Sequence, residues 1–546
     1  MKSTMQRGQL GLPLLMRHVH HVNGRSQLLS VTASGLYQET NFSQFSLRAG
    51  QLGVALERRG VRPGAVVATL MAASQEHLEA YLGVPASGRV LHTINIRLHD
   101  DQIIYIANAA QAEVFLVDAP NLSKFLNISL HLKNLKLLIV VGGGNVEAEG
   151  ARPYDEVAYE SLLAEAEPRI DWPDIDEQKA AILCFTGGTT GVPKGVAYSH
   201  RSIWLQAMSL CTVNSVGLGS TSKLLPAVPL YHVNGWGLPF AALMAGTDLL
   251  LPGQFLQAKA LLDLIDEKSP TIAAGVPTIW SDILELLRTR QRAYMGALKT
   301  IFCGGALVPR YLSDAYEEMG VRMVQAWGMT ETSSMSTIVQ IPRWAVTAED
   351  RLHYASAQGR IVCGLEARVV DLDGNIVPSD GISTGEIQIR GAWVTESYLG
   401  NEDHKHLHNG WLKTGDLGSI DQDGFLFLSD RVKDAIKSGG EWIPSLMLEE
   451  AIRSHPLVQD VAVIPLDDPR WQERPGAVIV VENGGNVTVD ELVLWLQERV
   501  AKWWIPDHWA FLEELPRTAV GKMDKKQLRQ AARDVLVWNT RVITPA

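Results

Sequence analysis

The chain has 546 residues, 46% of them hydrophobic and 20% charged, which is the composition of an ordinary globular protein. This length exceeds what one hydrophobic core usually serves, so we expect at least two domains. The net charge of −11 has the wrong sign for a nucleic-acid-binding surface, and no apolar run is long enough to cross a bilayer.

The N-terminus and the cysteines indicate the cellular compartment. The apolar run at 12–16 is too short and too broken for a signal peptide. The four cysteines, Cys184, Cys211, Cys303 and Cys363, show no paired spacing, as is usual for reduced thiols. We therefore expect a cytoplasmic protein, and no pattern around the cysteines indicates a catalytic thiol.

Residues from about 40 to 140 alternate between strand and helix patterns. This alternation is typical of a doubly wound α/β sheet. The acidic, turn-rich residues 144–173 are interpreted as a surface connection back to the sheet. Strands are predicted at 65–70, 89–91, 114–117 and 135–141, and helices at 77–82 and 102–107.

A loop rich in glycine and threonine follows a predicted strand at 181–184. Residues 185–196 read Phe-Thr-Gly-Gly-Thr-Thr-Gly-Val-Pro-Lys-Gly-Val. Glycines allow several backbone N–H groups to point at one anion, threonine hydroxyls add donors, and Lys194 adds positive charge, so the loop is predicted to bind phosphate. It is not a Walker A loop, because Lys194 stands between Pro193 and Gly195. The alternative is a plain surface hairpin.

A second α/β block follows this loop. It has the same rhythm of strand and helix as the first block, which predicts two stacked α/β subdomains in one large N-terminal domain. Helices are predicted at 203–208, 258–268, 278–290 and 310–319, and strands at 271–274, 299–302 and 321–324.

Three short stretches of this block combine glycines with aromatic or polar residues. Pro229–Gly237 crowds Tyr, His, Asn and Trp against two glycines, which suits a pocket wall, although a core loop with a hydrogen-bonded histidine would look the same. Cys303–Ala306 lets the backbone approach a flat ligand or simply makes a tight turn. In Gln325–Thr332, Glu331 suits Mg²⁺ beside phosphate oxygens, or it is a glutamate in a helix's first turn.

From about Gly359 the pattern changes to short strands and turns, which predicts a small, largely antiparallel β region. After Asp430 the chain is predicted to form a compact α+β unit, so we place a domain boundary near residue 430. The β region has strands at 367–370, 385–390 and 424–428; the last unit has helices at 446–454, 489–500 and 526–535 and strands at 461–464 and 477–481.

Three further motifs lie in this part of the chain. Asp416 follows a glycine turn and could accept hydrogen bonds from both hydroxyls of a ribose. The charged stretch at 430–444 contains two glycines at the predicted boundary, which suits a hinge that also contacts ligand. Lys522 follows a glycine in the loop at 516–525 and could reach outward to a ligand, although a lone lysine is usually a solvated one.

Taken in order, these motifs resemble those of the adenylate-forming superfamily of acyl-CoA synthetases, peptide-synthetase adenylation domains and luciferases. The likeness covers residues from about 40 to 530. The acyl-CoA synthetase branch fits best, because 91–98 (Leu-His-Thr-Ile-Asn-Ile-Arg-Leu) and 440–444 (Gly-Glu-Trp-Ile-Pro) look like the medium-chain fatty acyl-CoA ligases and the related 3-methylmercaptopropionyl-CoA ligases.

The sequence departs from the family's pattern at three positions. Gly187 stands where the phosphate loop usually has serine, Ile96 where relatives usually carry proline, and Leu307 where proline usually follows Gly-Gly-Ala. Only the first bears on the chemistry, because it removes one hydroxyl donor from the predicted phosphate site.

The resemblance implies two half-reactions. A carboxylate attacks the α-phosphate of ATP to give acyl-AMP and pyrophosphate, and the thiol of coenzyme A then displaces AMP. The expected cofactors are therefore ATP, Mg²⁺ and coenzyme A, and the partner is a small-molecule carboxylic acid of short to medium length, with 3-methylmercaptopropionate as one candidate. Three alternatives stay open. The substrate could be a medium-chain fatty acid, the enzyme could load a carrier protein instead of coenzyme A, or the chain could be a non-catalytic nucleotide-binding regulator. A homodimer would fit, because relatives are often dimers.

The resemblance also implies the site residues. Lys522, Glu331, Thr186 and His232 are expected in the chemistry, with Lys522 bridging the attacking carboxylate and the α-phosphate. The β- and γ-phosphates would be held by Thr186, Gly188, Thr189, Thr190 and Lys194, and the Mg²⁺ by Glu331 and Thr186. The adenine side would be formed by Gly304, Gly305, Trp327, Gly328, Met329 and Thr330. The ribose would be bound by Asp416 and Arg431, and the acyl group by His232 and Trp236.

The implied architecture is an AMP-binding domain over 1–430, a hinge at 431–434 that turns about Lys433, and a small mobile α+β domain over 435–546. Because Lys522 would obstruct the second half-reaction, the C-terminal domain is expected to rotate and present another face. That face carries Lys437, Ser438, Gly439, Gly440, Glu441 and Trp442.

Overall fold

The computed structural model describes residues 1, 3–143, 152–186, 193–400, 406–439, 441–482, 485, 487–516, 523–534, 536 and 538–540. The chain divides into two compact units. Unit 1 contains Met1–Glu366 and Arg390–Leu412, and unit 2 contains Ala367–Ile389 and Lys413–Ala546. Most of the predicted β region therefore groups with the C-terminal part of the chain. The domain border at 430 and the hinge at 431–434 stay predictions.

The first sheet of unit 1 has seven strands in the order β7-β6-β5-β3-β4-β8-β9. All its neighbouring strands are parallel except β8 and β9, which run antiparallel. This confirms the doubly wound sheet predicted from the first block. The elements are β3 (Val66–Leu70), α3 (Gln75–Ala86), β4 (Val90–Thr93), α4 (Asp100–Ala109), β5 (Ala112–Asp118), η1 (Ala119–Asn121), α5 (Leu122–Ser129), β6 (Leu137–Val141), β7 (Asp155–Ala158), α6 (Tyr159–Ala164), β8 (Ala180–Phe185) and β9 (Gly195–Ser199).

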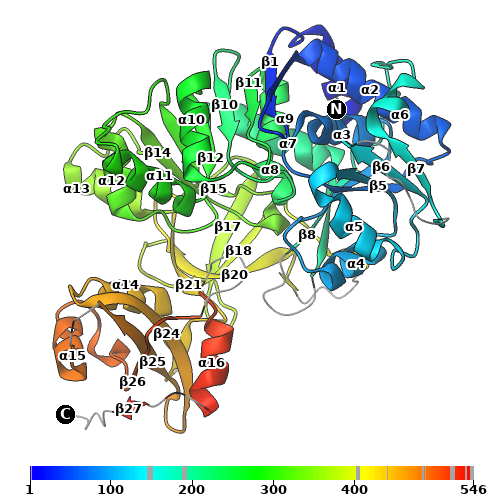
Figure 1. The fold of residues 1–546 in the computed structure, drawn as a ribbon. Helices are drawn as coiled ribbons and strands as arrows, with labels where there is room; N and C mark the ends of the chain where they lie inside the picture. Colours follow the sequence, from blue (N-terminus) through cyan, green and yellow to red (C-terminus); the bar gives the residue numbers. More distant parts are fainter. Residues whose placement is uncertain are drawn as a thin grey trace. The chain divides into compact units, whose positions relative to one another are not determined.

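The strands of this sheet are covered on both faces. All five residues of β6 are buried, as expected for a parallel strand between two layers of helices. Helices α4 and α5 cover one face, where Ile103 and Phe125 join a core that contains Phe115 of β5 (Figure 1).

The second sheet runs β2-β1-β11-β10-β12-β13-β14-β15-β16 within unit 1. It confirms the second α/β subdomain, and Trp280 of α11 lies fully buried in its core. Its elements are β10 (Lys223–Pro226), β11 (Asp248–Leu251), α10 (Ala258–Lys268), β12 (Ile272–Gly275), α11 (Pro277–Thr289), β13 (Thr300–Cys303), α12 (Arg310–Glu318), β14 (Arg322–Trp327), β15 (Thr337–Ile338), α13 (Ala348–Ser356) and β16 (Gly359–Ile361), with α7 (His200–Cys211), α8 (Val233–Trp236) and α9 (Leu238–Ala245) before them or between them.

The N-terminal residues contribute elements that no sequence pattern predicted. These are α1 (Leu12–His21), β1 (Gln27–Val31), β2 (Tyr37–Asn41) and α2 (Phe42–Arg58). Strand β1 pairs in parallel with β11, so Leu29 lies opposite Leu250. The start of the chain therefore completes the sheet that the second block builds.

Unit 2 consists of short antiparallel strands followed by a mixed sheet with helices. Its long hairpin of β24 (Val458–Asp468) and β25 (Gln472–Val481) pairs in parallel with β26, and Trp509 of β26 is fully buried. The α+β expectation for this part is confirmed. The other elements are β17 (Leu365–Val370), β18 (Gly385–Gly391), β20 (Trp411–Ile420), β21 (Phe425–Arg431), β22 (Ile436–Ser438), β23 (Glu441–Ile443), α14 (Ser445–Arg453), α15 (Val489–Gln497), η4 (Lys502–Trp504), β26 (His508–Phe511), α16 (Lys525–Asp534) and β27 (Asn539–Thr540), whereas β19 (Leu407–His408) belongs to unit 1.

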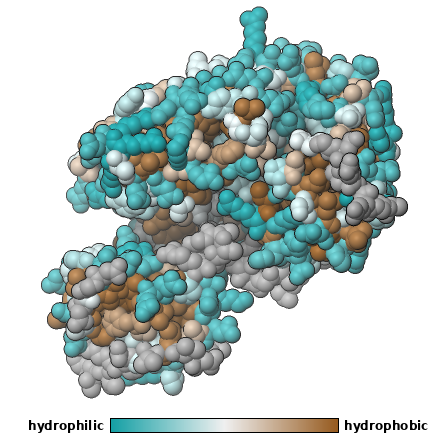
Figure 2. Space-filling model, in the orientation of Figure 1, coloured by the Kyte–Doolittle hydropathy of each residue, from teal (hydrophilic) through white to brown (hydrophobic). Residues whose placement is uncertain are grey.

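The surface is largely hydrophilic on the face drawn in Figure 2, where apolar residues appear as scattered patches. In the part of the chain that the structure describes, no helix combines the length and the apolar character needed to cross a membrane. The cytoplasmic location and the homodimer stay predictions.

Three buried histidines make the stability of unit 1 sensitive to acid. Burial lowers the pKa of His77, His92 and His200 to about 4, below the ordinary value of 6.5. The unfolded chain therefore binds these protons more tightly, so their contribution to stability is complete above pH 6.5 and is lost as the pH falls toward 4. His200 is the clearest case, because its Nδ1 accepts the N–H of Leu12 at 3.3 Å.

We expect His200→Asn, which keeps an acceptor but does not titrate, to reduce this acid sensitivity. Going from pH 7 to pH 5 should cost the native protein about 2 kcal/mol of unfolding free energy at His200 that the variant does not lose. Urea unfolding at both pH values measures this difference. His21→Asn, at an exposed histidine, is the control. An unchanged pH slope in His200→Asn contradicts the assignment.

Candidate active site

The predicted phosphate loop connects the antiparallel strands β8 and β9, in which Phe185 pairs with Gly195. At its neck the Thr186 N–H donates to the Lys194 carbonyl at 2.9 Å, and the Lys194 N–H donates to Thr186 Oγ1 at 3.3 Å. Helix α7 begins only at His200, so the loop does not lead straight into a helix as a Walker A loop does. Gly187, Gly188, Thr189 and Thr190 lie outside the described residues.

A distant segment, residues 393–399, ties this loop to the turn that carries Glu331. The Leu399 N–H donates to the Gly195 carbonyl at 2.8 Å, directly after the loop. The Thr395 N–H donates to the Glu331 carbonyl, also at 2.8 Å. The structure therefore brings the end of the phosphate loop and the predicted magnesium ligand to the same segment.

Two tyrosines hold this turn from either side. Tyr398 donates its hydroxyl to Glu331 Oε1 at 2.7 Å, and its ring centroid lies 4.8 Å from Lys194 Nζ. Tyr198, on β9, donates to the Thr330 carbonyl at 2.7 Å. Burial raises the pKa of both phenols, so both remain protonated donors. No sequence pattern indicated either tyrosine.

Glu331 fits a magnesium site with a single carboxylate. It lies in η2 (Thr330–Thr332) and is 7% exposed. Tyr398 binds Oε1, and none of the described residues donates a hydrogen bond to Oε2. Among these residues no three His, Cys, Asp or Glu side chains gather as a metal cluster, and Mg²⁺ is often held by one or two carboxylates plus substrate phosphates. A helix of three residues has little dipole, which disfavours the alternative of a first-turn glutamate.

The predicted pocket wall contains a turn of five residues whose φ angles are all left-handed. Such angles cost L-residues roughly 1–2 kcal/mol each and persist only where the surroundings fix them. The φ values are 44° for Val233, 55° for Asn234, 58° for Gly235, 59° for Trp236 and 72° for Gly237.

Side chains from three other parts of unit 1 fix this turn. The Trp236 carbonyl accepts hydrogen bonds from Gln206 Nε2 at 3.2 Å and Ser334 Oγ at 2.9 Å. Cys184 Sγ donates to Asn234 Oδ1 at 3.1 Å. Burial raises the pKa of the Cys184 thiol to about 11, which disfavours a reactive thiolate at this position.

The turn places the Trp236 indole against the end of β13. A Cβ atom on Gly304 would lie 3.6 Å from Trp236 Cη2, and one on Gly305 3.8 Å from Cζ2. Phe302 meets the indole edge-on, with centroids 5.8 Å apart. Trp327 ends the neighbouring parallel strand β14, at the sheet edge where α/β folds bind ligands. The structure thus joins motifs that the sequence showed only separately.

The other predicted residues of unit 1 lie around this edge. His232 is exposed, and its ring centroid is 6.0 Å from that of Tyr231. Gly328 packs so closely that a Cβ atom would lie 2.0 Å from the Ser334 carbonyl oxygen. Met329 and Thr330 follow it and lead into Glu331.

In unit 2 the predicted ribose ligands face each other across a strand pair. Asp416 of β20 pairs with Arg431 of β21, and Asp416 Oδ1 lies 2.7 Å from Arg431 Nε. Asp416 is 2% exposed, whereas half of the Arg431 side chain is exposed. A carboxylate held in this way can accept hydrogen bonds from a diol.

The residues expected in the second half-reaction form the hairpin of β22 and β23. Lys437 pairs with Trp442, and its Nζ lies 5.1 Å from the indole centroid. Ser438 is buried and accepts a hydrogen bond from Arg474 at 3.2 Å. Gly439 has a φ of +62°, and a Cβ atom there would lie 2.9 Å from Trp471, so only glycine fits. Gly440 and the Glu441 side chain lie outside the description.

Lys522 also lies outside the described residues, but its neighbour Lys525 begins α16 in a buried charged cluster. Lys525 Nζ lies 2.7 Å from Glu449 Oε1 and 2.6 Å from Ser445 Oγ. Asp430 accepts the Ser445 N–H. Burial raises the pKa of Asp430 and Glu449, although Lys525 opposes this shift. No sequence pattern indicated that this second lysine is buried.

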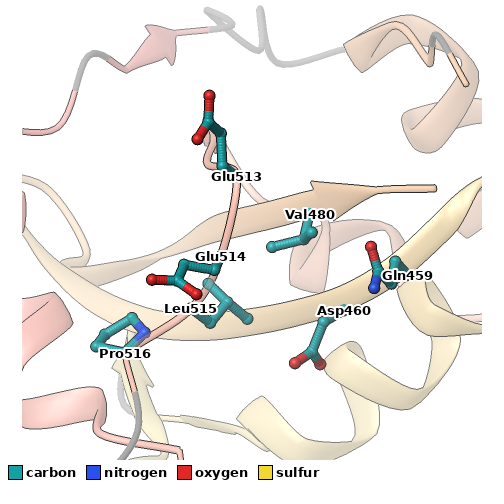
Figure 3. A pocket seen from close by; sticks show the side chains of 7 residues that line it. All are labelled: Gln459, Asp460, Val480, Glu513, Glu514, Leu515 and Pro516. Carbon is teal, nitrogen blue, oxygen red and sulfur yellow. The ribbon is translucent and has the colours of Figure 1, made fainter. Parts of the chain in front are cut away.

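A cavity of about 360 Å³ lies elsewhere in unit 2 (Figure 3). Asp460, Glu513 and Glu514 line it, and Glu513 points away from the other lining side chains. These carboxylates would repel phosphate, so the cavity does not suit a nucleotide.

Known proteins resemble this chain along nearly its whole length. The model of the AMP-binding enzyme family matches residues 19–399, and that of the AMP-binding enzyme C-terminal domain matches 447–522. The chain is 40% identical over 524 residues to the 3-methylmercaptopropionyl-CoA ligase of Ruegeria pomeroyi, covering 96% of this chain and 97% of that protein. It is 36% identical over 541 residues to the medium-chain-fatty-acid–CoA ligase of Ectopseudomonas oleovorans, covering 98% of each.

The solved structures agree with the fold. The anthranilate CoA ligase AuaEII in complex with anthranoyl-AMP has a TM-score of 0.82 at 26% identity and covers 98% of this chain and 99% of its own. This likeness confirms the predicted large N-terminal and small C-terminal domains. The chain belongs to the family of AMP-binding enzymes and is an ATP-dependent, AMP-forming acyl-CoA ligase.

Proposed function

We propose that this ligase activates a short- to medium-chain carboxylic acid, with 3-methylmercaptopropionate as the leading candidate. The observation that carries the proposal is the wall formed by Trp236, Phe302 and the Gly304–Gly305 turn. The Trp236 indole at this place, backed by the buried Phe302, favours a compact acid over a long chain, and a thioether gains roughly 0.3–1.5 kcal/mol beside an aromatic ring. The similarity to the Ruegeria pomeroyi enzyme supports the same substrate class.

In the proposed reaction the acid's carboxylate attacks the α-phosphate of ATP and pyrophosphate leaves; the thiol of coenzyme A then attacks the acyl carbon and AMP leaves. Such transfers depend mainly on positioning and charge neutralisation. We assign the β- and γ-phosphates to Thr186, Gly188, Thr189, Thr190 and Lys194, the α-phosphate to Lys522, and Mg²⁺ to Glu331 and Thr186. Adenine is assigned to Gly304, Gly305, Trp327, Gly328, Met329 and Thr330, and the ribose to Asp416 and Arg431. The acyl group is assigned to His232 and Trp236, and coenzyme A to the face at 437–442.

A pyrophosphate-release screen tests the substrate. The screen compares 3-methylmercaptopropionate with the straight-chain acids from acetate to dodecanoate. We expect 3-methylmercaptopropionate to give the highest kcat/KM. Mass spectrometry should detect the acyl-CoA only when coenzyme A is present.

The other outcomes separate the alternatives. A maximum at octanoate or beyond favours a medium-chain fatty acid ligase. Acyl-AMP that forms but does not transfer to coenzyme A favours carrier-protein loading. A flat screen across all acids favours a non-catalytic nucleotide-binding regulator.

We also propose that Lys433 is the hinge between the two half-reactions. It is exposed, and its turn is closed by the Asp434 and Ala435 N–H groups, which both donate to the Arg431 carbonyl. Lys433→Pro fixes φ and should slow acyl transfer to coenzyme A by about tenfold or more, while adenylation stays near the native rate. Single-turnover assays of each half-reaction measure this. Lys433→Ala is the matched control, and normal acyl transfer in the proline variant would count against the hinge.

A further inference from the structure

We propose that Tyr398 is a positioning residue of the adenylation step, and that it fixes the Glu331 carboxylate and the Lys194 ammonium together. This inference rests on the functions proposed above for Glu331 and Lys194. It adds a residue that lies in none of the sequence motifs.

One rigid side chain contacts both charged groups. The Tyr398 hydroxyl donates to Glu331 Oε1 at 2.7 Å, and Lys194 Nζ lies 4.8 Å from the centre of the ring. The phenol is itself fixed in place: the residue is 9% exposed, and the ring of His406 lies 4.7 Å away. Its next residue, Leu399, is bonded to the Gly195 carbonyl at the end of the phosphate loop.

Tyr398 also links two groups of opposite charge, because its ring lies against the Lys194 ammonium and its hydroxyl binds the Glu331 carboxylate. Among the described residues, Lys194 and Glu331 do not form an ion pair with each other, and both contact Tyr398. A direct pair between the exposed Lys194 ammonium and the buried Glu331 carboxylate would occupy both groups before substrate binds, because opposite charges attract. With each group held on Tyr398, the ammonium stays available for phosphate and the carboxylate for a cation.

Fixing one carboxylate oxygen matters for magnesium in particular. Mg²⁺ demands a nearly ideal octahedral geometry, so a ligand that rotates loses affinity. Partners that orient a metal ligand typically change metal affinity by about 10–100-fold. The Tyr398 hydroxyl is such a partner, and the oxygen it would orient is Glu331 Oε2, to which none of the described residues donates a hydrogen bond.

The first test removes only the hydroxyl. In Tyr398→Phe we expect Mn²⁺ binding in the presence of ATP, measured by electron paramagnetic resonance, to weaken about tenfold. The Mg²⁺ concentration for half-maximal pyrophosphate exchange should rise by a similar factor, with kcat at saturating Mg²⁺ nearly unchanged. Binding of ATP in EDTA should stay native, because the ring remains over Lys194.

The second test removes the ring as well. Tyr398→Leu should weaken Mn²⁺ binding at least as much and should also weaken ATP binding in EDTA by about fivefold, since Lys194 then pairs with Glu331. The two variants therefore separate the action of the hydroxyl from that of the ring.

The control is Tyr316→Phe, which removes another buried phenol hydroxyl, one that donates to the Trp280 carbonyl at 2.8 Å. It should lose stability but keep native metal dependence. The proposal is overturned if Tyr398→Phe binds Mn²⁺ as Tyr316→Phe does, or if it loses ATP binding in EDTA as strongly as metal binding. If the native enzyme shows no acid-dependent exchange, the proposed function fails, and the Mn²⁺ measurements still decide the role of Tyr398.

Discussion

Replacing Lys522 with alanine is expected to abolish adenylation, with a rate loss of ~100-fold or more, while acyl transfer from supplied acyl-AMP to coenzyme A continues. The side chain would supply positive charge where negative charge gathers on the α-phosphate and the attacking carboxylate. The second half-reaction develops no such charge at that place, so it should not need the lysine.

Pyrophosphate exchange reports the first half-reaction, and thioester formation from purified acyl-AMP reports the second. Lys526→Ala is a suitable control, because Lys526 is exposed on α16 and does not join the buried cluster of Lys525, Glu449 and Ser445. Equal loss of both half-reactions in Lys522→Ala would show that the residue does not act in adenylation alone.

Glu331→Gln should have the second largest effect, with adenylation reduced roughly 100-fold and the apparent Mg²⁺ affinity lowered. Glutamine keeps the shape of the side chain and an oxygen that can accept from Tyr398, but it removes the charge that binds a cation. Acyl transfer from supplied acyl-AMP, which releases no pyrophosphate, should stay within twofold of native.

A titration of pyrophosphate exchange with Mg²⁺ measures both quantities for Glu331→Gln. Glu349→Gln provides the control, since Glu349 is exposed on α13 in the same unit. Native Mg²⁺ dependence in the Glu331 variant would refute its role as metal ligand.

The sequence predicted the parts of the fold whose signal is local. Buried parallel strands such as β6 appear as unbroken apolar runs, and the helices between them show the expected periodicity. Strand β1 was not predicted, because the polar residues Gln27 and Ser30 leave only a short apolar pattern. Its pairing with β11 is what makes it a strand. Such pairing depends on contacts far apart in the chain.

The same distinction applies to the site. The glycine-rich loop and Glu331 could be predicted because their chemistry lies in consecutive residues. The contact of Trp236 with Gly304 arises only when the chain returns to the same sheet edge, and Tyr398 reaches Glu331 from another part of the chain. A single tyrosine or glutamine carries no spacing that marks it, so Tyr398 and Gln206 could not be found before the fold.

The left-handed turn at 233–237 also constrains how this enzyme's selectivity can evolve. Glycine meets no steric penalty at such φ angles, so the backbone does not resist exchanges that shrink Val233, Asn234 or Trp236 and enlarge the space beside them. A side chain on Gly237 is disfavoured, because its φ of +72° strains L-residues and its Cβ would lie 2.0 Å from Oε1 of the buried, hydrogen-bonded Gln206. If the turn borders the acyl group as proposed, mutation there opens room for larger acids more readily than it narrows the space.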